Sequence, residues 1–182
     1  MGAEQIKIRP AKPADAGEIA KVHIKTWQAS YAGIFPEDKL AELNQELQVR
    51  TERWYANIVN PDQLPALFVA ETENGEIVGF AGGGRQYIPQ YPYDSEIYVI
   101  YILPEFQRSG LGQRLMSATA GKLQELGYRS LMLWVLLENE ESRRFYEKLG
   151  GKLAGRDEYL RWDQTHALAA YAWDSLDVLI IS

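Results

Sequence analysis

The sequence predicts a mixed α/β fold in a single domain that spans residues 1–182. Segments with the two-residue alternation of strands are interleaved with segments whose apolar residues recur at helical spacing. The middle of the chain has the order strand, helix, strand, helix, strand, which is typical of a sheet covered by helices. No linker, repeat or low-complexity segment interrupts this order, and the length suits one domain.

The first third of the chain is predicted to form a short strand followed by helices. Residues 6–9 alternate like a strand, and Asp15 stands where the N-cap of the next helix is expected. The turn residues Asn60-Pro61-Asp62 end this region. The predicted helices cover residues 16–31, 36–43 and 45–58.

Strand signals dominate the remainder of the chain. Asn74-Gly75 is the strongest short hairpin signal, and Gly127 and Gly150 follow two helical segments as stop signals. Residues 130–137 are almost continuously apolar, as in a strand buried on both faces. The predicted strands cover residues 66–72, 77–82, 96–103, 130–137, 152–162 and 167–181, with helices over 111–126 and 138–149.

Composition excludes several classes of function. The net charge of −6 argues against nonspecific nucleic-acid binding, which depends on Lys and Arg. The chain has no cysteine, and His23 and His166 are not part of a metal-ligand motif, so no metal site is expected. There is no apolar run of signal-peptide or membrane-span length, so a cytoplasmic protein that does not bind membranes is expected.

A glycine-rich turn is the most informative segment. A strand ends at Pro104, and Gly110 and Gly112 open the next helix. Helix N-termini expose unpaired N–H groups that favour anions, and glycine lets a phosphate approach them. The segment is not a Walker loop, and Leu115 stands where a dinucleotide fingerprint has its third glycine. An anion cradle and a plain tight turn both fit this pattern.

The motif from Gln107 to Gly112 resembles the phosphate-binding motif of GNAT acetyltransferases, and the run from Asn139 to Gly151 resembles their second motif. The resemblance implies a central mixed, mostly antiparallel twisted sheet flanked by helices, with acetyl-CoA as cosubstrate. Arg108 departs from the pattern, because many members carry glycine there. The residues implied to bind the cosubstrate are Ile102, Leu103, Gln107, Arg108, Ser109, Gly110, Leu111, Gly112, Asn139, Ser142 and Tyr146.

Acetyl transfer to an amine requires a base, oxyanion stabilisation and an acid for the thiolate. Glu96 is the candidate base, with Asp94 as its rival, and regular alternation would put Glu96, Tyr98 and Ile102 on one face. The resemblance implies that Tyr146 is the general acid, that an N–H near Ile102 meets the oxyanion, and that attack is direct. The alternatives are a solvent-exposed Glu96 and a core Tyr146.

The resemblance places a small-molecule or peptide amine acceptor beside the first helices. Trp27, Tyr31 and Tyr98 are candidate acceptor-binding residues, and aromatic faces with carboxylates nearby would suit a cationic or aromatic amine. Trp27 and Tyr31 can equally be core residues. His166 can reach the site only if the last strands fold back over it.

Two further expectations concern the protein as a whole. A non-catalytic acyl-CoA-binding sensor or interaction domain is the alternative to an enzyme. The last predicted strand offers an apolar surface that could pair across a homodimer; its residues are Tyr171, Trp173, Leu176, Val178 and Ile180.

Overall fold

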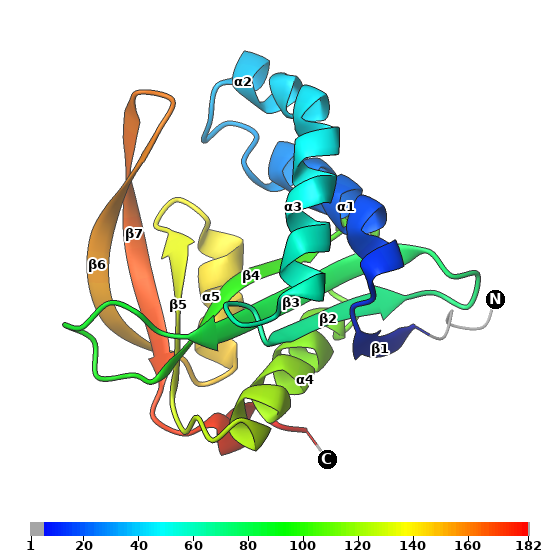
Figure 1. The fold of residues 1–182 in the computed structure, drawn as a ribbon. Helices are drawn as coiled ribbons and strands as arrows, with labels where there is room; N and C mark the ends of the chain where they lie inside the picture. Colours follow the sequence, from blue (N-terminus) through cyan, green and yellow to red (C-terminus); the bar gives the residue numbers. More distant parts are fainter. Residues whose placement is uncertain (1–5, 182) are drawn as a thin grey trace.

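The computed structural model describes residues 6–181, whose strands form one seven-stranded sheet in the order β1-β2-β3-β4-β5-β7-β6 (Figure 1). The strands are β1 (Lys7–Pro10), β2 (Ala66–Glu71), β3 (Ile77–Arg85), β4 (Ser95–Ile102), β5 (Leu131–Leu136), β6 (Lys152–Arg161) and β7 (Gln164–Trp173). Only β4 and β5 pair in parallel within this sheet of the described residues, so the predicted mixed, mostly antiparallel sheet is confirmed.

Helices cover the sheet because each has one apolar stripe to bury. The helices are α1 (Ala16–Ser30), α2 (Glu37–Glu42), α3 (Leu47–Val59), α4 (Leu111–Glu125) and α5 (Glu140–Lys148). Ile19 of α1 and Trp54 of α3 belong to a core cluster with Phe80 of β3. Met116 of α4 and Tyr146 of α5 belong to a second cluster over β5 and β7. None of the helices between residues 6 and 181 is both long and apolar enough to span a membrane.

Strands β4 and β5 are joined at one end only. Their register includes two pairs, Ser95 with Leu131 and Glu96 with Met132. Beyond Glu96 the two strands diverge, whereas β4 stays paired with β3 as far as Ile102. The divergence splits the sheet and leaves one side of β4 facing a gap between strands.

A β-bulge in β4 changes the face on which its residues lie. Gly82 pairs with Val99 and Gly83 pairs with Ile97, so Tyr98 is the extra residue. In β3, Gly84, Gly82 and Phe80 lie on the same face, because side chains alternate along a strand. Their partners in β4 are Glu96, Val99 and Tyr101, respectively. Glu96 therefore lies on the face of Val99 and Tyr101. The regular alternation expected from the sequence, with Glu96 and Ile102 on one face, is wrong.

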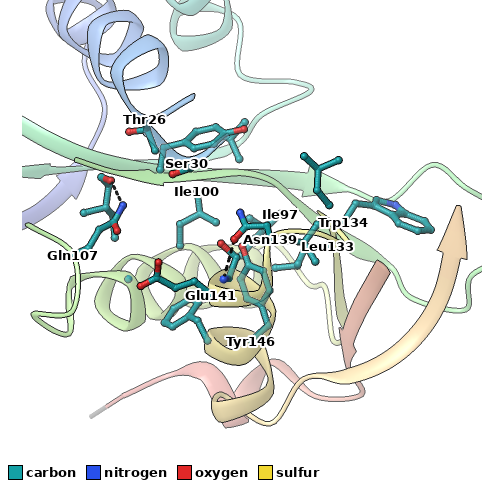
Figure 2. A pocket seen from close by; sticks show the side chains of 18 of the residues that line it. Thr26, Ser30, Ile97, Ile100, Gln107, Leu133, Trp134, Asn139, Glu141 and Tyr146 are labelled. Atoms are coloured by element: carbon teal, nitrogen blue, oxygen red, sulfur yellow. Dashed lines mark hydrogen bonds between the residues drawn. The ribbon is translucent and has the colours of Figure 1, made fainter. Parts of the chain in front are cut away.

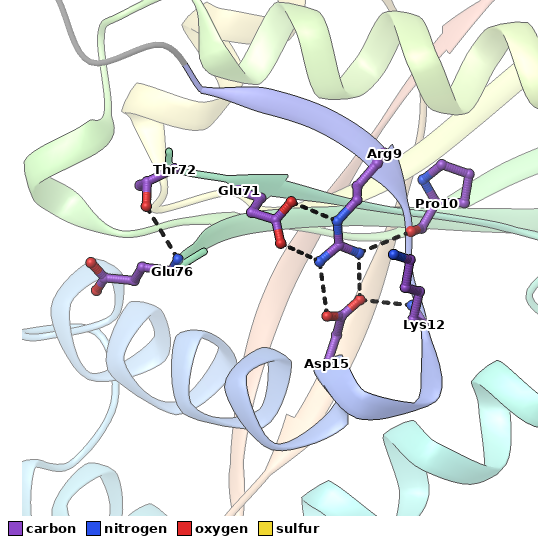
Figure 3. Close-up of polar contacts among 7 residues, drawn as sticks. All are labelled: Arg9, Pro10, Lys12, Asp15, Glu71, Thr72 and Glu76. Atoms are coloured by element: carbon purple, nitrogen blue, oxygen red, sulfur yellow. Dashed lines mark hydrogen bonds and ion pairs between the residues drawn. The ribbon is translucent and has the colours of Figure 1, made fainter. Parts of the chain in front are cut away.

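Arg9 joins β1, β2 and the start of α1 (Figure 3). Its guanidinium donates hydrogen bonds of 2.8 and 2.6 Å to the Glu71 carboxylate and of 2.7 and 3.0 Å to that of Asp15. Asp15 also accepts the N–H of Lys12 at 2.7 Å. Asp15 precedes α1 as expected, but its side chain does not cap the helix, because Arg9 and Lys12 engage its oxygens.

The end of the chain differs from the prediction of one strand over residues 167–181. Strand β7 ends at Trp173, and a 3-10 helix follows at Leu176–Leu179, where Ser175 accepts the N–H of Asp177 at 3.2 Å. Leu176 is fully buried in the cluster beneath α4. Because β5 and β6 pair with both edges of β7, this strand is not free to pair across a dimer. Pairing of this strand across a homodimer is therefore excluded, while the homodimer itself stays a prediction.

Candidate active site

A cleft of about 1170 Å³ lies where β4 and β5 diverge (Figure 2). One end, here called the glycine end, is formed by Gln107, Arg108, Gly110, Gly112 and Gln113. The opposite end, here called the aromatic end, is formed by Thr26, Trp27, Ser30, Tyr31, Phe35, Tyr159 and Leu168. Residues of β4, β5 and α5 line the cleft between the two ends.

The glycine end presents unpaired backbone N–H groups. The first α4 hydrogen bond runs from Arg114 N to Gly110 O, at 3.2 Å. The N–H groups of residues 111–113 therefore have no partner within the helix, and the helix dipole favours an anion beside them. The loop before them is held in place by Gln107 Nε2, which donates to Ile102 O at 2.9 Å, and by Ser109 Oγ, which donates to Phe106 O at 2.7 Å.

The two glycines of this end have different roles in the structure. Gly110 has a left-handed φ of 83°, and a Cβ built on it would meet no atom within 4 Å. A Cβ on Gly112 would lie 3.0 Å from Cζ of Phe145, so this glycine allows α4 to pack against α5. Arg108 also adopts a left-handed φ, of 58°. The loop thus keeps a backbone conformation that favours glycine at the position where the sequence departs from the family pattern.

The β4 wall of the cleft presents backbone groups as well. Leu103 N donates to Val78 O at 2.9 Å, toward β3. Backbone N–H groups point alternately to the two sides of a strand, so the N–H groups of Ile100 and Ile102 point away from β3, toward the split. The side chain of Leu103 is buried in the core, as is that of Leu111. Leu103, Leu111 and Ser109 are not among the residues that line the cleft.

Helix α5 and its N-cap contribute Asn139 and Tyr146 to the cleft (Figure 2). Ser142 of α5 lines the cleft as well. Asn139 Oδ1 accepts the N–H of Ser142 at 3.1 Å, which makes Asn139 the N-cap of α5 and leaves its Nδ2 available to a ligand. Tyr146 is buried, with 6% of its surface exposed, yet it lines the cleft. Burial raises the pKa of Tyr146, so the hydroxyl is protonated near neutral pH and can donate a proton.

Glu96 lies half-buried in β4 beside the joint with β5, and it is not among the residues that line the cleft. Burial alone raises the pKa of Glu96 to about 7. Tyr98, the next residue, lines the cleft and donates its hydroxyl proton to Arg85 O. Asp94 is engaged elsewhere, because its carboxylate accepts the N–H groups of Arg129 and Ser130 at 2.9–3.2 Å.

The aromatic end is held together by contacts between rings. Trp27 donates Nε1–H to the Tyr101 hydroxyl at 2.9 Å, and its ring is 5.0 Å from Tyr31 and 5.9 Å from Phe35. Tyr101 stacks on His23 at 4.9 Å. Burial, reinforced by two arginines, lowers the pKa of His23 to about 3, so the imidazole is neutral. Trp27 and Tyr31 therefore both pack against core residues and line the cleft.

Some features of this end were not predicted. No carboxylate is among the residues that form it, so this end has the aromatic faces that would suit a cationic or aromatic amine but not the carboxylates. Strand β7 does fold back, since His166 packs against Phe35 with ring centroids 4.6 Å apart. Thr26, Tyr101 and Tyr159 also line the cleft. For Tyr101 the only sequence signal was its place in an apolar strand, and the role of Tyr159 depends on how the last hairpin bends.

Comparisons with known proteins agree with this geometry. The sequence model of the Acetyltransferase (GNAT) family matches residues 24–151. The chain is 35% identical over 155 residues to the uncharacterized N-acetyltransferase YuaI of Bacillus subtilis, which covers 85% of this chain and 84% of that protein. The PaiA N-acetyltransferase of Thermoplasma acidophilum, solved in complex with coenzyme A, matches with a TM-score of 0.71 at 20% identity, over 93% of this chain and 99% of that one.

Proposed function

The chain belongs to the acetyltransferase (GNAT) family, and we propose that it transfers the acetyl group of acetyl-CoA to the amine of a small molecule or peptide. Transfer proceeds by direct attack of the amine, with no covalent enzyme intermediate. The observation that carries this proposal is the split between β4 and β5, which exposes backbone N–H groups between the glycine end and a protonated, buried tyrosine.

The residues of the cleft fit acetyl-CoA. The unpaired N–H groups of residues 111–113 and the Arg108 guanidinium suit the pyrophosphate. The N–H group of Ile102, beside the glycine end, suits a carbonyl of the pantetheine arm, and Nδ2 of Asn139 supplies another donor. The cosubstrate supplies the reactive thioester when it is bound.

The residues around the split divide the proton transfers between them. Glu96, ionised above about pH 7, accepts a proton from the acceptor ammonium through a water molecule. The Ile100 N–H, near Ile102 on the same side of β4, stabilises the oxyanion of the transition state. Tyr146 protonates the leaving thiolate, since burial keeps its hydroxyl protonated. A pure coenzyme A sensor would need neither a base nor an acid at these positions.

Calorimetric titration with acetyl-CoA tests the donor site. Arg108 is exposed, so Arg108→Glu should weaken binding at least tenfold without disturbing the fold. Arg129→Glu makes the same charge change at an exposed position after the far end of α4 and is the matched control. Substituting Gly112 is a poorer test because of its contact with Phe145.

A thiol-release assay with a panel of primary amines then tests the reaction. Release that depends on an amine supports the acetyltransferase. Saturable acetyl-CoA binding with no release across the panel would instead indicate a sensor. If the folded protein binds no acetyl-CoA, the proposed function is wrong.

A further inference from the structure

Four buried polar atoms lack a hydrogen-bond partner within residues 6–181: Thr26 Oγ1, Trp134 Nε1, Arg161 Nε and His166 Nε2. Thr26 and Trp134 line the cleft. Arg161 and His166 lie beside the aromatic end, in contact with its rings. Buried polar groups without partners are rare and costly. Trp134 lies on β5 and packs against Tyr91, away from the aromatic end, but the other three groups lie at or beside that end and point to a ligand that supplies their missing partners.

Arg161 is the strongest of these groups because it carries a permanent charge. Its guanidinium carbon lies 4.5 Å from the ring centre of Trp162 and 5.7 Å from that of Trp27. Within the part of the chain that the structure describes, no carboxylate forms an ion pair with it. Arg161 is half-buried and is not itself among the residues that line the cleft, but its guanidinium lies directly behind Trp27, which is.

The turn that carries Arg161 is strained. Trp162 and Asp163 connect β6 to β7 with left-handed φ values of 48° and 58°, a conformation for which Asn-Gly is preferred. A bulky residue such as Trp rarely adopts this conformation. The Trp162 ring packs at 90° against Phe35, with centroids 5.4 Å apart, and supports the Arg161 guanidinium. The strained turn thus places a cation beside the aromatic end.

The charges around this end do not suit a polycationic acceptor. Every side chain that forms the aromatic end is uncharged. Besides Arg161, Arg50 lies 5.8 Å from the Trp27 ring and is paired with Glu46. Glu138, 3.5 Å from His166, has 46% of its side chain exposed. A polyamine would need several carboxylates here, whereas the one charged group among the unpaired atoms, the Arg161 guanidinium, is a cation that can only donate.

We propose that the acceptor is a primary amine that also carries a carboxylate, as an amino acid does, and that Arg161 binds this carboxylate with His166 beside it. This inference rests on the proposed acetyl transfer. A guanidinium and a carboxylate form charge-assisted, often bidentate hydrogen bonds, which select strongly for the anion. Arg161 acts as a specificity residue and is not part of the proton-transfer machinery.

The test compares acceptors that differ only in the carboxylate. Values of kcat/KM are measured by thiol release for glycine and glycinamide, for phenylalanine and phenylalaninamide, and for putrescine. Because the amides are less basic amines, the decisive quantity is the change in the acid-to-amide ratio between enzymes. We expect Arg161→Gln to lower that ratio about 10- to 100-fold, Arg161→Lys to retain part of it, and Arg156→Gln, at an exposed position of β6, to leave it unchanged.

The inference is overturned if the acid-to-amide ratio of kcat/KM is the same in Arg161→Gln as in the wild type while acetyl-CoA affinity and melting temperature are also unchanged. Preference of the wild type for the amides or putrescine also overturns it, while acetyl transfer stands. Thiol release with none of the amines removes the proposed function and the inference with it. As a second readout, phenylalanine should change the fluorescence of the tryptophans flanking Arg161 in the wild type but not in Arg161→Gln.

Discussion

Replacing Glu96 by Gln gives the sharpest test of the proton pathway. Burial raises the pKa of this carboxyl from its ordinary 4.5 to about 7. A base with that pKa is about half ionised at pH 7 and roughly one-tenth ionised at pH 6. In the wild type, kcat/KM should therefore fall about tenfold for each pH unit below 7. The Gln variant should lose about 10²- to 10⁴-fold in kcat/KM, and its profile should lack this acidic limb, the fall of kcat/KM below pH 7.

The assay is thiol release between pH 5.5 and 9, with one amine used for both enzymes. Ionisation of the amine then cancels in the ratio of wild-type to variant rates, which should rise up to pH 7 and flatten above it. Because burial and not a neighbouring charge shifts the pKa, added salt should leave the limb in place. Asp94→Asn should keep the limb, since Asp94 binds backbone N–H groups. A ratio that stays flat from pH 5.5 to 9 would refute the assignment of Glu96 as the base.

Three other substitutions probe the remaining features. Tyr146→Phe should lower kcat about a hundredfold while changing the acetyl-CoA dissociation constant less than about twofold; unchanged kcat would exclude Tyr146 as the acid. Arg108→Gly should raise the free energy of unfolding by about 1 kcal/mol in thermal melts, because it relieves the left-handed φ of 58°, and should weaken acetyl-CoA binding severalfold in calorimetry. Arg9→Met should cost about 2 kcal/mol in urea unfolding by leaving the Asp15 carboxylate without its cationic partner. Burial would raise the pKa of Asp15, but the hydrogen bonds and charges of Arg9 and Lys12 together lower it. The difference from the wild type should therefore shrink as the pH falls below about 4; a constant difference would contradict this account.

The fold was largely predictable because its helices and hairpins end at residues, mainly glycines, whose own backbone preferences stop or turn the chain. Gly127 and Gly150, expected to stop helices, adopt left-handed φ values of 94° and 83°, and Gly75 turns the predicted hairpin with a φ of 84°. These conformations depend on the glycine itself, so a single sequence reveals them. The glycine end was found for the same reason, since a strand, a loop and a helix start are contiguous in the chain.

The remaining features depend on partners far away in sequence. The bulge at Tyr98 arises from pairing with Gly82 and Gly83, where a Cβ on Gly83 would overlap the Glu96 carbonyl oxygen, and β4 alone gives no sign of it. The strand expected to run to residue 181 ends early because the Ser175 side chain turns the chain and Leu176 is buried under α4. An apolar pattern cannot distinguish that burial from a strand.

The one-ended joint between β4 and β5 has a mechanical consequence for the base. The two halves of the sheet form a V whose apex is at the Ser95 and Glu96 pairs. When the two halves move relative to each other about this apex, each atom is displaced in proportion to its distance from the apex. A motion about this joint would displace the glycine end most and the Glu96 carboxylate least, so the cleft would open for a bulky cosubstrate without displacing the proposed base.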